Sequence, residues 1–163
     1  MESVESTLQR YRGALARVVS SYARSRADRE DLAQEIRLGL VRAWPRFRGE
    51  SSERAYVFRV AHKVALNYAH RRKRGRLEFS EPEEPTDPRP SPEAQLAGQQ
   101  RARQLLIEVR ELRDPYRQVA ILALEGLEPR EIAEVLGVTS NVASVRLHRA
   151  KAMLAERWKE TEP

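Results

Sequence analysis

Hydrophobic residues recur at steps of three and four along most of the chain, the spacing that places side chains on one face of a helix. The first such set predicts a helix and consists of Leu8, Tyr11, Leu15, Val18 and Tyr22. After a break at Ala27-Asp28, a second helix is predicted from the four-residue row of Leu32, Ile36, Leu40 and Trp44. Pro45 ends this second helix, because proline lacks the backbone N–H that a helix needs.

A third helix is predicted from about Glu53 to Arg74, after a turn at 48–52 that supplies a serine cap, and Gly75 is its expected stop. Its apolar positions form a wide stripe of Val57, Val60, Ala61, Val64, Ala65 and Tyr68. The remaining face is polar and carries Arg59, Lys63, Asn67, His70 and Arg74. A helix of this kind packs with one face and offers the other to solvent or to a partner.

The helical pattern stops at residues 77–92, which hold five of the nine prolines and whose charged residues are mostly acidic. Proline blocks both a helix and an interior strand, so this stretch is predicted to be an extended linker. We therefore expect a helical domain over residues 1–75, an acidic Pro-rich linker over 76–92 and a second helical domain over 93–163.

Beyond the linker, a helix is predicted from about Pro92 to Leu112, and Asp114-Pro115 is a restart signal with Asp114 as the cap. The next helix spans 116–124 and ends at Glu125-Gly126. No strand pattern is visible in the sequence, so the expected fold is all-α.

A helix-turn-helix is predicted in the second domain. Pro129 opens a short helix whose inward residues are Ile132, Ala133 and Leu136. Gly137 permits the left-handed residue of a tight turn, and Thr139 caps a further helix over about 141–157. Helix, glycine turn and helix at this spacing form the arrangement of DNA-binding helix-turn-helix domains.

The second helix of this motif offers a face suited to reading DNA. Its inward stripe is expected to consist of Ala143, Leu147, Ala150 and Leu154. Its outward residues are then Asn141, Ser144, Val145, His148 and Arg149. Small polar, basic and apolar groups together match the base edges of a major groove. The alternative, from the residues alone, is a packing helical hairpin with a solvated face.

The net charge of +6 is distributed unevenly along the chain. Residues 1–75 carry 17 basic and 8 acidic residues, whereas 76–98 carry 2 basic and 6 acidic ones. A basic N-terminal domain favours a polyanionic partner, most simply nucleic acid. Its basic run at 70–74 suits phosphate groups and the negative end of a helix dipole equally well. The aromatic side chains nearby, which are either base-stacking or core residues, are Tyr56, Phe58 and Tyr68.

The second helix has a different character, an acidic strip of Asp28, Asp31 and Glu35 with Gln34 beside it. Three interpretations remain open from the residues alone. The carboxylates either bind metal or act in acid–base chemistry, or they form a solvated face, or they dock a basic partner protein.

Several function classes lack the residues that they need. Cysteine is absent, and the three histidines, His62, His70 and His148, do not have the spacing of a metal site. The sequence has no P-loop, dinucleotide fingerprint or nucleophile elbow, so no enzyme activity, metal or cofactor is expected. It also has no run of about eighteen apolar residues and no secretory signal pattern, so we expect a cytoplasmic protein.

Three segments of the chain resemble the extracytoplasmic-function (ECF) group of bacterial sigma factors. They are DREDLAQEIRLGLVRAWPRFRGESS, AYVFRVAHKVALNYAHRRKR and EGLEPREIAEVLGVTSNVASVRLHRAK. In this order they are similar to the family's core-binding helix, its −10-reading helix and its −35-reading helix-turn-helix. The resemblance covers nearly the whole chain and implies a first domain like sigma region 2 and a second like sigma region 4.

The resemblance also implies roles for individual residues. Docking on the coiled-coil clamp of the polymerase β′ subunit falls to Asp31, Gln34, Glu35, Arg37 and Val41. Capture of a base flipped from the −10 non-template strand falls to Arg48, Gly49, Glu50, Ser51 and Ser52. Contacts with that strand and the adjoining duplex fall to Tyr56, Arg59, Lys63, Asn67, Arg71 and Arg72. Contacts with the −35 element fall to Asn141, Ser144, Val145, His148 and Arg149.

The sequence therefore predicts an alternative sigma factor with no catalytic activity of its own. It is expected to bind core RNA polymerase (β′ clamp helices and β flap), to recognise the −35 and −10 elements and to help melt the promoter. The resemblance also implies an anti-sigma factor as a partner, and a linker that threads the channel near the polymerase active site. The alternatives are a helix-turn-helix regulator that binds an operator without polymerase, and a metal-dependent nuclease.

Overall fold

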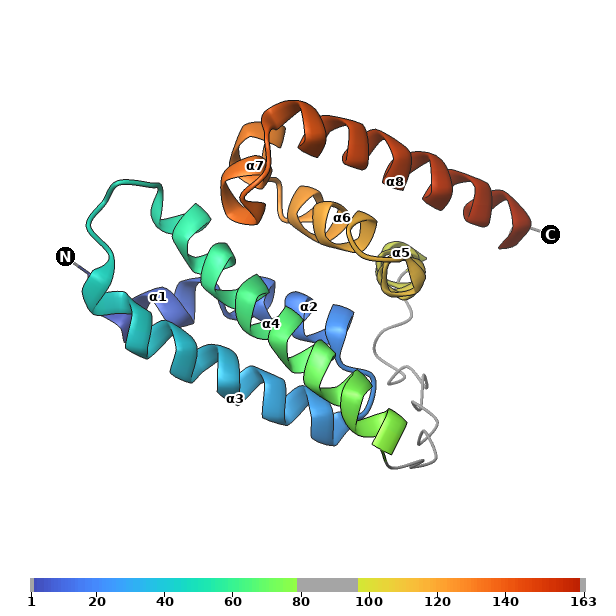
Figure 1. Ribbon diagram of the computed structural model, residues 1–163. Coiled ribbons are helices and arrows are strands. Elements are labelled where there is room, and N and C mark those ends of the chain that lie inside the picture. Colours follow the sequence, from blue (N-terminus) through green and yellow to red (C-terminus); the bar gives the residue numbers. More distant parts are fainter. Residues whose placement is uncertain (1, 79–96, 162–163) are drawn as a thin grey trace. The chain divides into compact units, whose positions relative to one another are not determined.

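The computed structural model describes residues 2–78 and 97–161, and every regular element within these two ranges is a helix (Figure 1). The chain divides into two compact units, Met1–Thr86 and Asp87–Pro163, each with its own buried core. The all-α fold predicted from the sequence is confirmed. Within the described ranges, no helix combines the length and the apolar character that a membrane crossing requires.

Over its described residues 2–78, the first unit contains four α-helices and one short 3₁₀ helix. In chain order they are α1 (Val4–Arg10), α2 (Arg12–Tyr22), α3 (Arg26–Ala43), η1 (Trp44–Arg46) and α4 (Glu53–Glu78). The long helices α3 and α4 run antiparallel side by side, and α2 packs against both of them (Figure 1). Their buried side chains include Val18, Leu32, Ile36, Leu40, Val57 and Phe58. The apolar row predicted for the second helix is therefore confirmed as core.

The single first helix expected from the sequence is in fact two helices, because the chain turns at Tyr11. The two helices bury different faces. In α1 the buried residue is Thr7 rather than Leu8, whereas α2 buries Leu15 and Val18 as predicted. A continuous helix with the stripe expected from Leu8 onward would not orient both segments toward the core.

Two predicted helix ends are also wrong. Helix α3 begins at Arg26 rather than after Asp28, since the hydroxyl of Ser25 caps it by accepting from the Asp28 N–H at 3.0 Å. Helix α4 continues through Gly75 to Glu78. A glycine ends a helix when it adopts a positive φ, and Gly75 does not. In contrast, the predicted serine cap of α4 is confirmed, because Ser52 Oγ accepts from the N–H of Ala55 at 3.1 Å.

Close approach of α3 and α4 depends on Gly39. A Cβ atom at this position would lie 2.9 Å from Cγ2 of Val64, which is shorter than any normal carbon–carbon contact. The absence of a side chain thus lets α4 lie directly against α3, and it fixes the spacing of the polar residues that the two helices present.

The second unit consists of α5 (Ala97–Glu111), α6 (Tyr116–Leu124), α7 (Pro129–Leu136) and α8 (Ser140–Thr161). Helices α5, α6 and α7 all pack against α8. The core includes Val109, Val119, Leu122, Ile132, Ala143 and Ala150. The linker predicted over 76–92 overlaps the end of α4, which extends to Glu78, so its first three residues are helical. The rest of that linker and the predicted start of the helix near Pro92 lie outside the described residues.

The restart before α6 differs from the prediction in its cap. Pro115, not Asp114, occupies the N-cap position, and no side chain caps this helix. The carboxylate of Asp114 instead accepts from the guanidinium of Arg117 at 3.1 Å, so it is engaged by a side chain rather than by the helix backbone.

The helix-turn-helix has the predicted geometry. Gly137 adopts the left-handed conformation with φ 67° at the end of α7. The Thr139 hydroxyl accepts from the Val142 N–H at 3.2 Å and so caps α8. The turn chemistry read from the sequence therefore sets the angle at which α8 leaves the motif.

Candidate functional site

Helix α3 presents an exposed ridge between two grooves. The ridge consists of Asp31, Gln34, Leu38 and Val41, all of them exposed. Two residues flank the ridge, Glu35 on the side of α4 and Arg37 on the side of α1 and α2. The residues predicted to dock on polymerase thus do form one continuous surface. Leu38 lies at its centre and was missed, although the spacing of Gln34, Leu38 and Val41 places them on one helix face.

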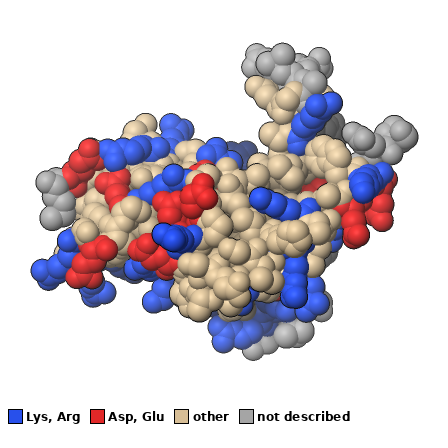
Figure 2. All heavy atoms as spheres, turned by 90° about the horizontal axis from the view of Figure 1, so that it is seen from above, with Lys and Arg blue, Asp and Glu red and all other residues tan. Residues whose placement is uncertain are grey.

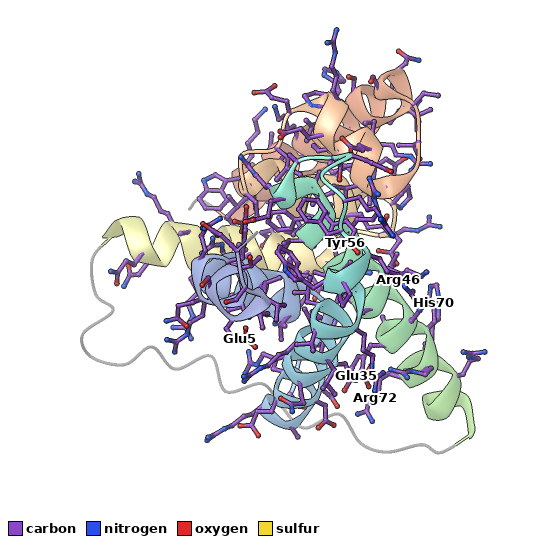
Figure 3. The ribbon with its side chains drawn as sticks, turned by 90° about the vertical axis from the view of Figure 1, so that its left-hand side faces the viewer. Glu5, Glu35, Arg46, Tyr56, His70 and Arg72 are labelled. Atoms are coloured by element: carbon purple, nitrogen blue, oxygen red, sulfur yellow. The ribbon has the colours of Figure 1, made fainter. Side chains whose placement is uncertain are left out.

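The groove beside Arg37 lies between α3 and the pair α1 and α2, with a volume of about 640 Å³. Its apolar lining includes Leu8, Leu15, Ala16, Val19 and Ala33. Its basic lining consists of Arg12, Arg26, Arg29 and Arg37, against two glutamates, Glu5 and Glu30. One of these glutamates, Glu5, is labelled in Figure 3. The groove therefore combines an apolar floor with a positively charged rim, a feature that the sequence pattern did not reveal.

The groove on the other side of the ridge lies between α3 and α4, with a volume of about 310 Å³. It is lined by Glu35, Leu38, Gly39, Arg42, Val64, Asn67 and Arg71. Residues predicted for polymerase binding and residues predicted for DNA binding thus border the same depression.

Two ion pairs connect α3 to the C-terminal half of α4. Arg71 Nη2 donates to Glu35 Oε2 at 2.6 Å, and Arg72 Nη2 lies 2.9 Å from Asp28 Oδ1. Figure 3 shows Glu35 and Arg72 from these neighbouring helices. Asp28 also accepts from the hydroxyl of Tyr68 at 3.1 Å, and burial, followed by this carboxylate, raises the pKa of Tyr68 to about 12. Asp28 is therefore a buried structural residue, and its expected place in a surface acidic strip is wrong.

The polar face of α4 is a row of exposed residues spaced four apart. It comprises Arg59, Lys63, Asn67 and Arg71, with Arg72 beside the last of them. Twelve residues of helix cover about 18 Å, so the row extends over several nucleotides of a strand. The row as predicted from the sequence is exposed along its whole length.

The loop before α4 carries the other residues expected at the −10 strand. Arg48, Gly49, Glu50 and Ser52 are exposed, and Ser51 is half-buried. Gly49 has φ 73°, a conformation that glycine adopts at no steric cost. Because the Ser52 hydroxyl caps α4, the loop is anchored directly to the helix that carries the basic row.

An aromatic cluster supports this loop. The ring centroids of Phe47 and Tyr56 lie 4.8 Å apart, and those of Trp44 and Phe47 lie 5.4 Å apart. The hydroxyl of Tyr56 donates to the carbonyl of Ala43 at 2.6 Å, so this half-buried ring is fixed in place (Figure 3). The other two candidates for base stacking, Phe58 and Tyr68, are core residues.

In the second unit, α8 presents the expected face. All five outward residues are exposed, namely Asn141, Ser144, Val145, His148 and Arg149. The inward Ala143 and Ala150 are completely buried, while Leu147 and Leu154 are half-buried. The outward positions predicted for α8 after the tight turn are thus open to solvent.

Comparisons with known proteins identify the family. Sigma-70 region 2 matches residues 7–75, and Sigma-70 region 4 matches residues 100–154. The chain is also 31% identical over 128 residues to the RNA polymerase sigma factor YlaC of Bacillus subtilis, covering 77% of this chain and 74% of that protein. The chain belongs to the sigma-70 family. Within it the chain is a sigma factor of the ECF group, so the resemblance read from the sequence is confirmed.

Two solved structures share the fold of this sigma factor. One is CnrH in complex with the cytosolic domain of CnrY, with a TM-score of 0.68 and 22% identity over 98% of this chain and 89% of that one. The other is RpoE in complex with the anti-sigma factor NepR from Bartonella quintana. Its TM-score is 0.78 at 19% identity, over 97% of this chain and 98% of that one.

Membership of this family makes the protein a transcription initiation factor rather than an enzyme. Within the described ranges, no group of three or more His, Asp or Glu side chains is placed to hold a metal ion. On the face of the sigma factor shown in Figure 2, basic and acidic side chains are intermingled rather than separated into large fields of one sign.

Proposed function

We propose that this sigma factor binds core RNA polymerase through the α3 ridge, recognises the −10 element with α4 and its preceding loop, and recognises the −35 element with α8. The observation that carries the proposal is the ridge itself, an exposed, partly apolar surface in the region 2 segment that borders the basic row of α4. Together these contacts would help melt the promoter of a restricted set of genes.

The composition of the ridge suits a protein partner. Leu38 and Val41 are 43% and 42% exposed, and polar residues surround them. Exposed apolar side chains at the centre of a polar rim are the usual anatomy of a protein–protein interface. The β′ clamp helices would cover this ridge and reach Glu35 and Arg37 on its two flanks.

The −10 strand would meet two surfaces of different chemistry. Arg59, Lys63 and Arg71 offer cations to backbone phosphates, which gives affinity without sequence information. The loop 48–52 would receive the flipped base, beside an aromatic cluster that holds the loop in place. Flipping a base costs a few kcal/mol, which the polymerase and loop contacts would offset.

Recognition of the −35 element would fall to α8 in the major groove. Arg149 and His148 provide donors, Asn141 and Ser144 provide small polar groups, and Val145 provides an apolar contact for a thymine methyl. The β flap of the polymerase would hold this second unit, and the acidic linker would enter the channel near the polymerase active site.

A regulatory partner follows from the same proposal. CnrH and RpoE were solved with CnrY and with the anti-sigma factor NepR, respectively. We infer that this sigma factor has an anti-sigma factor of its own, which would cover the polymerase- and DNA-binding surfaces until transcription is induced in the cytoplasm.

The test of this function compares DNA binding by the free protein and by its complex with core polymerase. Genomic fragments retained only by the complex should share an asymmetric site with two separated elements. Retention of a symmetric site by the free protein would instead establish an operator-binding regulator. Cleavage of the fragments with magnesium would establish a nuclease.

A further inference from the structure

The two ion pairs between α3 and α4 differ in their access to solvent. In the pair of Glu35 and Arg71 both side chains are open, with 39% and 54% of their surface exposed. In the other pair the side chain of Asp28 is only 12% exposed and also holds the Tyr68 hydroxyl. In the first pair the carboxylate can therefore be exchanged for another ligand of the arginine, so we call this pair exchangeable. The second pair is part of the core of the unit.

The exchangeable pair joins the two surfaces of the proposed function. Glu35 flanks the ridge proposed for polymerase, and Arg71 ends the basic row proposed for DNA. Both line the 310 Å³ groove, together with Leu38 from the ridge and Asn67 from the row. A polymerase helix that covers the ridge and a DNA strand that follows the row therefore approach the same carboxylate and guanidinium.

We propose that the Glu35–Arg71 pair is a latch that couples polymerase binding to DNA binding. In the free protein the carboxylate of Glu35 is bound to the guanidinium of Arg71, and this lowers the affinity of Arg71 for phosphate. When polymerase engages Glu35, Arg71 is released to a backbone phosphate of the −10 strand. The inference rests on the proposed function and adds a reason for the free protein to bind DNA weakly.

The chemistry of the pair supports this exchange. An exposed ion pair contributes little to stability, so its loss costs the fold almost nothing. A phosphate accepts the same charge-assisted, bidentate hydrogen bonds from arginine as a carboxylate does. Since coupling between two ligands is reciprocal, bound DNA would raise the affinity for polymerase by the same factor.

The test uses the full-length protein without polymerase and a labelled single-stranded DNA 20-mer of mixed sequence, because a phosphate contact does not depend on sequence. Glu35→Gln should bind this strand about 3- to 10-fold more tightly than the wild type. Its salt dependence should steepen by about 0.7 in log–log slope, the value for one further phosphate on a single strand.

Glu30→Gln is the matched control. Glu30 lies on the same helix, is exposed and pairs with Arg26 of its own helix at 3.0 Å. This variant makes the same change in net charge without releasing a residue of the basic row, so its affinity should change less than 2-fold. In an Arg71→Gln background, Glu35→Gln should likewise bring no gain, because nothing remains to be released.

Three results would overturn the latch: equal affinities of Glu35→Gln and Glu30→Gln, a gain that persists in Arg71→Gln, or no measurable binding by Glu35→Gln. Binding of the wild-type protein to core polymerase is measured in parallel. If the wild type binds core while Glu35→Gln shows no gain, only the latch fails. If the wild type does not bind core, the proposed function fails, whatever the DNA result.

Discussion

His62 is a titratable side chain that the folded chain removes almost completely from water. It is 2% exposed, and its Nδ1 atom lies 3.4 Å from the hydroxyl of Tyr22. In the described part of the chain its Nε2 atom has no hydrogen-bond partner. Burial accordingly lowers the pKa of His62 from 6.5 to about 4. The sequence placed this residue on α4 but gave no sign that it faces α2.

The buried His62 predicts a specific acid sensitivity. Its pKa is lower in the folded than in the unfolded chain, so the unfolded chain takes up the proton first as the pH falls. The stability from the neutral ring is fully present above pH 6.5 and is lost as the pH falls to about 4. At about pH 4 the loss in the free energy of unfolding amounts to about 3 kcal/mol.

Urea unfolding at pH 7 and at pH 4.5 measures this loss. His62→Gln does not titrate in this range and should lose about 2 kcal/mol less than the wild type between the two pH values. The control is His148→Gln, which makes the same substitution at an exposed position of α8. An undiminished loss in His62→Gln would show that other groups cause the acid sensitivity.

At the scale of elements, the positions of the helices were predictable and several of their ends were not. Helices α6 and α7 follow from turn residues that act locally, the positive-φ glycines Gly126 and Gly137. The break at Tyr11 depends on which side chains reach the core, and that is a property of the packed unit. The start of α3, in contrast, is set locally by the Ser25 cap, a signal that the sequence contains. Asp28 shows the difference most clearly, since its partners Tyr68 and Arg72 are 40 and 44 residues away along the chain.

The same distinction applies to the candidate site. Helical spacing and the resemblance were enough to place the ridge of α3, the row of α4 and the outward face of α8. They did not reveal the cross-helix pairs or the two grooves. The cross-helix pairs and the groove between α3 and α4 depend on how closely these two helices approach, which Gly39 decides. The other groove depends on how α1 and α2 pack against α3.

Gly39→Ala tests this approach. The new methyl group would press on Val64, and overpacking of a tight contact should lower the free energy of unfolding by about 1–2 kcal/mol. Thermal or urea unfolding measures the change, and Val64→Ala in the same chain should restore part of it.

Gly75→Ala is the matched control in α4, where a Cβ atom would meet no other atom within 4 Å. Alanine is the better helix former, so this variant should be about 0.5–1 kcal/mol more stable than the wild type. Equal effects of the two substitutions would contradict the account of the α3–α4 contact.

At the scale of the whole molecule, the sigma factor carries its binding surfaces on two units with separate cores. The first unit presents the ridge of α3 and the row of α4, and the second presents the outward face of α8. Weak binding by each surface is sufficient for such a protein, because joining several contacts in one complex multiplies their effect. We expect the ridge to make the contact with polymerase on which the other contacts depend.

Binding to purified core RNA polymerase measures the contribution of the ridge, with the wild type compared with Gln34→Ala/Leu38→Ala. The control, Gln100→Ala/Leu124→Ala, removes the same two kinds of exposed side chain from the second unit. We expect tight binding by the wild type and the control, and binding about 30-fold weaker by the ridge variant, which corresponds to about 2 kcal/mol. Equal affinities of the wild type and the ridge variant, or no binding by the folded wild type at micromolar concentration, would contradict this expectation.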